Sequence, residues 1–336
     1  MKWLCLILLF SFWACSDSSG TTPAVDVSGT DSGTSVEDVS ALDSGSSEDT
    51  QDPGSEDLAS PVPDVPGVEE GPELKNEKVQ LMVKGVVREY RLYIPSERPE
   101  SGMPLVMAFH GGGARNWPYP QEALWHQLSE SEGFAMVYPL SELLPGNEGE
   151  WQLNTAAESR QDLDFVEAII DDLAARYTID ETKVYASGYS LGGMFIYELA
   201  CNLSSRFAAL ASHAGTMPVA PSSCEPEQST AIIHTHSTTD FIIAYGNRWD
   251  WKEWDSVGTM MDIPSLVDYW SSKFSCQTET ETEAPSSLHI VHEDCEAEVR
   301  VEHYRLDSGE HDWPDAIGAE STHEILWSFF EGFSKP

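Results

Sequence analysis

The sequence predicts an α/β fold in which a mainly parallel sheet is flanked by helices. Two runs, residues 105–109 (LVMAF) and 134–138 (FAMVY), are apolar at every position, as expected for strands buried on both faces of a parallel sheet. Beyond the second run, segments with helical spacing of apolar residues alternate with further apolar strands. This alternation specifies an α/β sheet whose ligand sites lie at the carboxyl ends of the strands.

The remaining elements follow in order along the chain. Residues 86–94 alternate with charged and aromatic side chains, which predicts an early, half-exposed strand. In residues 162–177 the apolar side chains share one side of a helix, and residues 183–187 supply the next strand. We expect a helix over 191–200, strands over 207–212, 231–235 and 299–306, and a closing helix over 321–333.

The first 76 residues differ in composition from the rest and predict an export signal followed by a tether. Lys2 precedes an apolar run ending at Phe12, which is too short to span a bilayer but typical of a signal peptide. Ala14-Cys15 resembles a bacterial lipobox, so we expect a lipoprotein signal over residues 1–15 and a lipid on Cys15, with ordinary secretion as the alternative. Residues 16–76, rich in Ser, Asp, Glu, Gly and Pro, predict a disordered acidic tether before a folded domain over 77–336.

The charge of the chain excludes one class of partner. The formal net charge is −39, and a protein without a basic surface cannot replace the counterions of phosphate groups. We therefore expect no nucleic-acid binding. Membrane contact is expected only through the lipid on Cys15.

The cysteines predict disulfides. Of six cysteines, Cys5 lies in the signal and Cys15 at its end. An even number left in an exported chain predicts two bonds, and we favour the local pairings among the three possible, Cys201 with Cys224 and Cys276 with Cys295. His289, His292 and Cys295 are an alternative metal-ligand set, which an oxidising compartment disfavours. We expect no metal and no organic cofactor.

The strongest chemical signal is the G-x-S-x-G motif of residues 188–192, which lies directly between a predicted strand and a predicted helix. This is the context of a nucleophile elbow, where small residues allow a tight, strained turn that exposes the serine. We therefore expect Ser190 to be a nucleophile. The alternative is a glycine-rich turn with an incidental serine.

A nucleophilic serine needs a base and an acid that orients it, in the chain order Ser, Asp, His for this kind of fold. Asp240 follows the apolar strand 231–235, and His311 follows the last strand. These two are the candidate acid and base. The competing carboxylates lie farther from the strand end, at Asp250, Asp255 and Asp262; His303 and His323 fall within a strand and a helix and are expected to be structural.

The sequence also contains a candidate oxyanion-binding loop. His110-Gly111-Gly112-Gly113 ends the first buried strand and resembles the HGGG loop that supplies backbone donors. We assign one amide donor to Gly112, with Gly113 as the alternative, and the other to Leu191.

These motifs, together with the final His-x-Trp-Pro, resemble those of the secreted polyhydroxybutyrate depolymerase and feruloyl esterase family of α/β-hydrolases. The resemblance covers roughly residues 79–333 and implies an α/β-hydrolase domain that cleaves esters through a Ser-His-Asp triad. The chain departs from the family pattern at three places, which affects the expected pocket and not the reacting groups: His236-Ser237 replaces His-Gly, Gly309-Glu310-His311 replaces Gly-Gly-His, and Trp313-Pro314-Asp315 replaces Trp-Pro-Gly.

Several aromatic residues are candidates for substrate contact. Trp249, Trp251 and Trp254 alternate with acidic residues after the proposed acid, and flat apolar faces suit sugar rings or aromatic acyl groups. Packing of a long loop explains them equally well, and the same holds for Trp117 and Tyr119. The candidate substrate-binding residues are His110, Tyr189, Trp249 and Trp313.

The expected function is hydrolysis of a carboxylic ester outside the cytoplasm, at a bacterial surface or in the periplasm. The resemblance implies acyl esters of plant cell-wall polysaccharides or polyester oligomers as substrates. The alternative from another class is an inactive hydrolase fold that binds polysaccharide or a protein partner. A peptidase or lipase acting through the same triad is a further possibility, although the charged loop around Trp249 makes a poor lipase lid.

Overall fold

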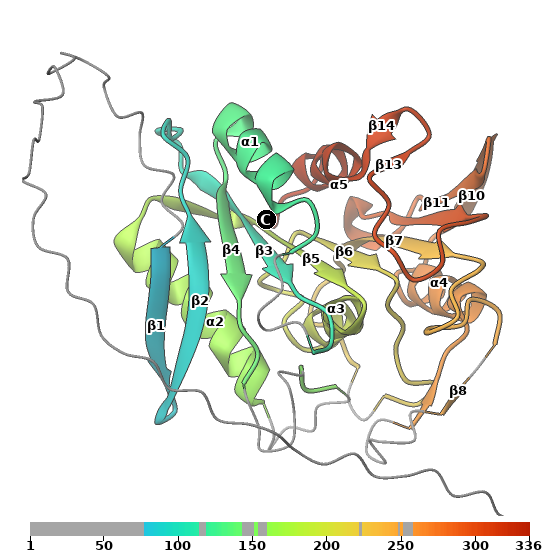
Figure 1. Cartoon of the computed structure of the whole chain (residues 1–336), viewed down its shortest axis with the longest axis horizontal. Coiled ribbons are helices and arrows are strands. Elements are labelled where there is room, and N and C mark those ends of the chain that lie inside the picture. The colour runs from blue at the N-terminus through green and yellow to red at the C-terminus, as the bar shows by residue number, and fades with distance from the viewer. Residues whose placement is uncertain are drawn as a thin grey trace, which may run out of the picture. The chain divides into compact units, whose positions relative to one another are not determined.

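The computed structural model describes residues 77–113, 119–142, 151–153, 160–221, 224–247, 249–250 and 258–336. Its main element is a ten-stranded sheet with the order β1-β2-β4-β3-β5-β6-β7-β12-β11-β10 (Figure 1). These strands are β1 Glu77–Val83, β2 Val86–Tyr93, β3 Met103–Phe109, β4 Ala135–Pro139, β5 Ile179–Tyr189, β6 Ala209–His213, β7 Ala231–Ser237, β10 Thr278–Ala284, β11 Ser287–Glu293 and β12 Val301–Leu306. Four short strands form two separate ribbons: β8 Trp249–Asp250 with β9 Thr259–Met260, and β13 Ala316–Ile317 with β14 Glu320–Ser321.

The centre of the sheet is parallel and its margins are antiparallel. Strands β4, β3, β5, β6, β7 and β12 pair in parallel, whereas β1 and β2 on one side and β11 and β10 on the other pair antiparallel. The two apolar runs identified in the sequence lie in β3 and β4, where nearly every side chain is buried. The predicted α/β fold with a mainly parallel sheet is confirmed.

Helices cover both faces of the sheet (Figure 1). They are α1 Glu122–Glu132, α2 Gln161–Arg176, α3 Leu191–Asn202, α4 Ile263–Lys273 and α5 Thr322–Glu331, with a short 3₁₀ turn at Glu296–Glu298. From β3 the chain crosses to β4, which lies on the side of β3 toward β1. The crossovers that carry α2, α3 and α4 move in the opposite direction along the sheet, toward β12. Because parallel crossovers are right-handed, α1 must lie on the face opposite α2, α3 and α4. Helix α5 packs against α1.

The elements expected from the sequence agree with the structure to within a few residues at each end. The helix expected over 162–177 is α2, that over 191–200 is α3, and the closing helix is α5. The helices and strands that the sequence analysis did not identify are α1, α4, β1, β10, β11 and the short strands β8, β9, β13 and β14. Within the described ranges, no helix is both long and apolar enough to span a membrane. The expected signal peptide, Cys15 and the tether lie outside the described residues.

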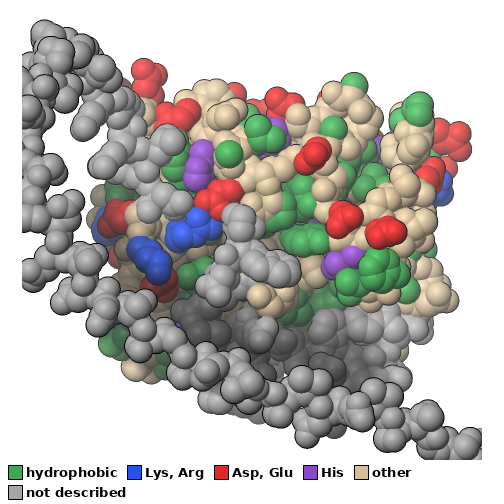
Figure 2. Space-filling view, viewed as in Figure 1, with side chains coloured by type: hydrophobic (Ala, Val, Ile, Leu, Met, Phe, Trp, Pro, Cys, Tyr) green, Lys and Arg blue, Asp and Glu red, His purple; other side chains and the backbone are tan. Residues whose placement is uncertain are grey.

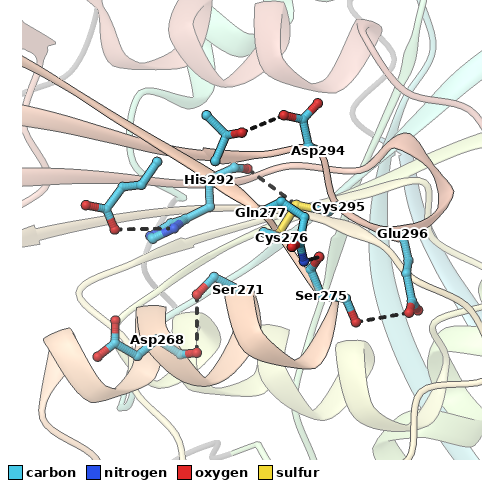
Figure 3. The surroundings of a disulfide bond; sticks show 11 residues. Asp268, Ser271, Ser275, Cys276, Gln277, His292, Asp294, Cys295 and Glu296 are labelled. Atoms are coloured by element: carbon cyan, nitrogen blue, oxygen red, sulfur yellow. Dashed lines mark hydrogen bonds and ion pairs between the residues drawn. A yellow bond between two sulfur atoms is a disulfide. The ribbon is translucent and has the colours of Figure 1, made fainter.

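Two disulfides join the described cysteines in the favoured pairing. Cys201 at the end of α3 is bonded to Cys224, and Cys276 after α4 is bonded to Cys295. The second bond brackets the hairpin of β10 and β11, and Figure 3 shows the hydrogen bonds that surround it, such as that from Ser275 Oγ to Glu296 Oε1. Disulfides of this loop length restrict the unfolded chain and stabilise the folded one.

One buried ion pair fixes the start of α2 against the sheet. Arg88 of β2 and Asp162 of α2 lie 2.7 Å apart with side chains only 3% and 4% exposed. The second oxygen of Asp162 accepts the backbone N–H of Gln152, while Arg88 also donates to the backbone carbonyls of Leu140 and Gln161. Because removal of one partner leaves the other charge buried and unpaired, this contact is costly to break.

We therefore expect Asp162→Ala to lower the free energy of unfolding by about 3 kcal/mol. The matched control is Lys84→Ala, which removes an ion pair to Asp164 whose lysine is 71% exposed; its effect should be below about 1 kcal/mol. Urea denaturation of both variants, with disulfides intact, measures the difference. Equal effects would contradict this interpretation of the buried pair.

Candidate active site

Ser190 lies in the sharp turn between the end of β5 and the start of α3. Its backbone has φ 55° and ψ −117°, a strained conformation for a residue with a side chain. A Cβ at Gly188 would lie 2.2 Å from the carbonyl oxygen of Gly192, and a Cβ at Gly192 would lie 2.1 Å from the carbonyl oxygen of Phe109. Both outer glycines of the motif are therefore required by contacts with backbone atoms that cannot rotate away.

Ser190, His311 and Asp240 come together at the carboxyl ends of β5, β12 and β7. The Nε2 atom of His311 lies 2.8 Å from Oγ of Ser190, and its Nδ1 atom lies 2.7 Å from Oδ2 of Asp240. One imidazole thus bridges a hydroxyl and a carboxylate, which is the geometry that general-base activation of a serine needs. Of the competing carboxylates, Asp262 caps α4 by accepting the N–H of Ser265.

The environment of Asp240 favours its ionised form. Burial alone raises the pKa of this carboxyl, but hydrogen bonds from His236, His311 and the backbone of Ile243 hold the pKa well below its usual range. Oδ1 accepts the N–H groups of Ile242 and Ile243, each at 2.8 Å. The carboxylate is therefore charged at neutral pH and fixed in orientation.

The glycine loop after β3 lies against the nucleophile turn. A Cβ at Gly111 would lie 3.3 Å from Cβ of Ser190, and a Cβ at Gly112 would lie 3.6 Å from the side chain of Leu191. This proximity brings the backbone of the loop and the start of α3 to the same side of the serine. Gly112 and Leu191, the two candidate amide donors, are therefore neighbours in space.

His110 lies beneath the loop. Its side chain is buried, with Nε2 accepting the N–H of Ser141 at 3.2 Å and Nδ1 2.8 Å from the carbonyl oxygen of Gly111. Its own carbonyl accepts the indole N–H of Trp151. These contacts fix the loop, and the assignment of His110 to substrate binding stays a prediction.

Tyr189 lies beside His311 and belongs to a cluster of aromatic side chains. The Tyr189 hydroxyl donates to the backbone carbonyl of His311. The Trp313 ring meets the rings of Tyr119 and Tyr189 edge to face, with centroid distances of 5.5 Å and 6.2 Å. The centroid of the His213 ring lies 5.0 Å from that of Trp313. Of the other candidates, Trp117, Trp251, Trp254 and the side chain of Trp249 lie outside the described residues.

Two features of the site were missed by sequence reasoning. Phe241 and Ile242, directly after the candidate acid Asp240, are 73% and 56% exposed, and contiguous exposed apolar side chains are typical of binding surfaces. Figure 2 shows hydrophobic side chains beside acidic and histidine side chains on the face in view. His236, treated as part of a family motif alone, lies 3.2 Å from Oδ2 of Asp240. The exposed pair could have been predicted from two adjacent apolar residues in a loop. The contact of His236 could have been predicted from its spacing of four residues from Asp240.

The alternative metal-ligand set is used in other ways. Cys295 forms a disulfide, and His289 hydrogen-bonds Glu302 at 2.9 Å. In the part of the chain that the structure describes, no group of three or more His, Cys, Asp or Glu residues is arranged to hold a metal ion.

Comparison with known proteins agrees with the fold and the motifs. The acetyl xylan esterase from Aspergillus awamori superposes with a TM-score of 0.54 at 14% identity, covering 76% of this chain and 99% of that one. The bifunctional acetylxylan esterase/xylanase XynS20E of Neocallimastix patriciarum is 25% identical over 68% of this chain, and feruloyl esterase B of Piromyces equi is 22% identical over 70%. The chain spans only 31% and 43% of the length of these two relatives.

The fold is the α/β-hydrolase fold. Residues 88–238 match the family model for the esterase PHB depolymerase domain. This match, with the similarity to feruloyl and acetylxylan esterases, identifies the central part of the chain as similar to this esterase family.

The backbone contacts of the nucleophile turn lead to a stability prediction. In Gly192→Ala the new methyl group meets the Phe109 carbonyl, so α3 must shift away from β3; we expect the free energy of unfolding to fall by about 3 kcal/mol or more. The matched control is Gly246→Ala, where a Cβ would meet nothing within 4 Å. Thermal denaturation of the two purified variants compares them, and an unchanged melting temperature in Gly192→Ala would contradict the contact.

Proposed function

We propose that this protein is an extracytoplasmic serine carboxylic-ester hydrolase in which Ser190 is the nucleophile, His311 the general base and acid, and Asp240 the residue that orients His311. The observation that carries the proposal is the pair of hydrogen bonds at 2.8 Å and 2.7 Å that links the three side chains through one imidazole. The match of residues 88–238 to the family model for the esterase PHB depolymerase domain supports the same reaction class.

The geometry leads to a two-step reaction. His311 Nε2 accepts the Ser190 proton while Oγ attacks the ester carbonyl carbon, and the oxygen that becomes negative is stabilised by the amide N–H groups of Gly112 and Leu191. The imidazolium then gives its proton to the departing alcohol, leaving an acyl group on Ser190. Water enters, His311 removes its proton, and hydrolysis of the acyl-enzyme restores the serine. Asp240 remains charged throughout and stabilises the imidazolium.

The proposed substrates are acyl esters of plant cell-wall polysaccharides, of the feruloyl or acetyl-xylan type, or short hydroxybutyrate oligomers. The relatives named above act on the first two types by their names, and the family description refers to the third. Tyr189 and Trp313 beside His311 supply flat apolar faces for a sugar ring or an aromatic acyl group. No step of this reaction needs a metal or an organic cofactor.

The test compares the purified full chain with Ser190→Ala and with Ser131→Ala, a serine on the exposed side of α1. Substrates are p-nitrophenyl acetate, methyl ferulate, acetylated xylan and hydroxybutyrate oligomers. We expect kcat on at least one substrate to fall by about 10³-fold or more in Ser190→Ala and to be unchanged in Ser131→Ala. Undiminished hydrolysis in Ser190→Ala would refute the nucleophile, and a folded protein inert on all four substrates would favour the non-catalytic binding function.

We further propose that residues 1–15 are a lipoprotein signal, that Cys15 carries a lipid, and that residues 16–76 tether the domain to a membrane. The apolar run and the Ala14-Cys15 pair support the signal, and the absence of Lys and Arg between Lys2 and Lys75 supports an extended acidic tether. The two disulfides of the domain support export.

Expression of the full chain in a bacterial host tests the lipid anchor. We expect the wild type to sediment with membranes and to carry acyl chains, and Cys15→Ser to carry none, because the substituted residue has no thiol to acylate. Cys5→Ser is the matched control and should behave as the wild type. If Cys15→Ser is processed and sediments with membranes as before, lipidation of Cys15 is excluded.

A further inference from the structure

A row of buried polar side chains lies behind the proposed triad. Tyr197 of α3, His234 and His236 of β7, and Asp240 after β7 are all at least 94% buried. Polar groups placed this deep in a core are expensive unless their hydrogen bonds are satisfied. The bonds within this row are therefore the reason that it can exist.

The row is continuous. The Tyr197 hydroxyl lies 2.6 Å from Nδ1 of His234, and Nε2 of His234 lies 3.2 Å from Nδ1 of His236. Nε2 of His236 lies 2.8 Å from the carbonyl oxygen of Ile243 and 3.2 Å from Oδ2 of Asp240. The row thus ends on the same carboxylate oxygen that accepts Nδ1–H of His311.

The acceptor at one end fixes the direction of every bond in the row. A carbonyl oxygen can only accept, so Nε2 of His236 carries the proton that it shares between Ile243 and Asp240. In the neutral Nε2–H tautomer of His236, Nδ1 is an acceptor, which requires Nε2–H on His234. Nδ1 of His234 accepts in turn, so Tyr197 donates. All bonds point toward Asp240.

Burial keeps His234 neutral. The pKa of His234 is lowered well below its ordinary value by burial and by the neighbouring histidines. His303, which lies alongside, has a pKa lowered to about 3, mainly by burial. Its Nδ1 lies 3.2 Å from the carbonyl oxygen of His234, and its Nε2 lies 2.9 Å from the Tyr245 hydroxyl. His303 therefore braces the backbone that carries the row and adds no charge to it.

We infer that Tyr197, His234 and His236 form a positioning relay that donates a polarised hydrogen bond to Oδ2 of Asp240 and so controls how much of its negative charge is available to His311. This inference rests on the proposed function, because it gives Asp240 and His311 their proposed roles. Hydrogen bonds in a chain polarise one another, so Tyr197 strengthens the donation by His236 from two residues away. The three residues touch no reacting atom.

Other groups also act on His311 and must remain unchanged in a test of the relay. The titratable side chains that face His311 or flank it come from four segments: Tyr189 of β5, His213 of β6, Asp240 after β7, and Glu310 and Asp312 in its own loop. Substitutions in the relay leave all five side chains in place.

The first experiment reads the tautomers by nitrogen NMR of the imidazoles in the intact wild-type protein, with resonances assigned through variants. The chain has ten histidines, which makes this assignment practicable. We expect Nε2–H, with an unprotonated Nδ1, on both His234 and His236. A proton on Nδ1 of His236 would reverse the row and overturn the inference, whether or not the protein hydrolyses any ester.

The second experiment removes the final donor. In His236→Leu, Oδ2 of Asp240 loses one donor and should therefore interact more strongly with Nδ1–H of His311. The proton resonance of this Nδ1–H should move downfield. The acid limb of the pH profile of kcat/KM should move to higher pH. We expect kcat to fall by about tenfold with little change in KM, as for loss of one hydrogen bond to a charged group. His236→Gln can both accept and donate in the same row, so it should restore most of the wild-type behaviour.

Matched controls separate the relay from general packing. His323→Leu removes another buried histidine, on α5, and should move neither the resonance nor the profile. Tyr197→Phe should shift both in the same direction as His236→Leu but less, whereas Tyr185→Phe, which loses a buried bond to the Phe333 carbonyl, should shift neither. An unchanged His311 resonance in folded His236→Leu overturns the relay, whereas retained activity in Ser190→Ala overturns the proposed function instead.

Discussion

The contact between the start of α3 and the ends of β3 and β5 is the constraint on which the site depends. At this point helix backbone and strand backbone approach so closely that no side chain fits at Gly188 or Gly192. This contact holds Ser190 in its strained conformation. The N–H of Ser190 also donates a hydrogen bond to the carbonyl of His213 on β6. A serine in a relaxed turn would point along the helix surface, where neither a base nor amide donors could reach it.

The parallel sheet positions the other two side chains of the site, because it brings distant segments of the chain to one edge. Asp240 and His311 are 71 residues apart in the chain, yet both follow strands that pair with each other in parallel, β7 and β12. Their loops therefore begin side by side, and a short reach from each is enough for an imidazole to meet a carboxylate. Because each residue is held by its own strand, the geometry does not depend on a long flexible loop.

Much of this arrangement could be predicted from the sequence, because it depends on local patterns. Continuous apolar runs identified β3 and β4, and a glycine motif between strand and helix identified Ser190. The hairpin of β10 and β11 was missed because β10 reads TETETEA, with no apolar side until its last residue, and it is exposed along its whole length. The polar row behind Asp240 could not be predicted either, since nothing in the spacing of Tyr197 and His234 shows that α3 and β7 bring them within hydrogen-bond distance.

The acidic strand β10 has a consequence for how copies of this protein meet. Within the described residues it is the last strand of the sheet, so one row of its backbone N–H and C=O groups has no strand beside it. A strand of another chain can pair with such an edge. Here Glu279, Glu281 and Glu283 place like charges along that edge, and two molecules that approach edge to edge repel each other before their backbones can pair. The disulfide at the base of the hairpin holds this charged margin in place, so the charges of the edge strand itself protect this end of the sheet against aggregation.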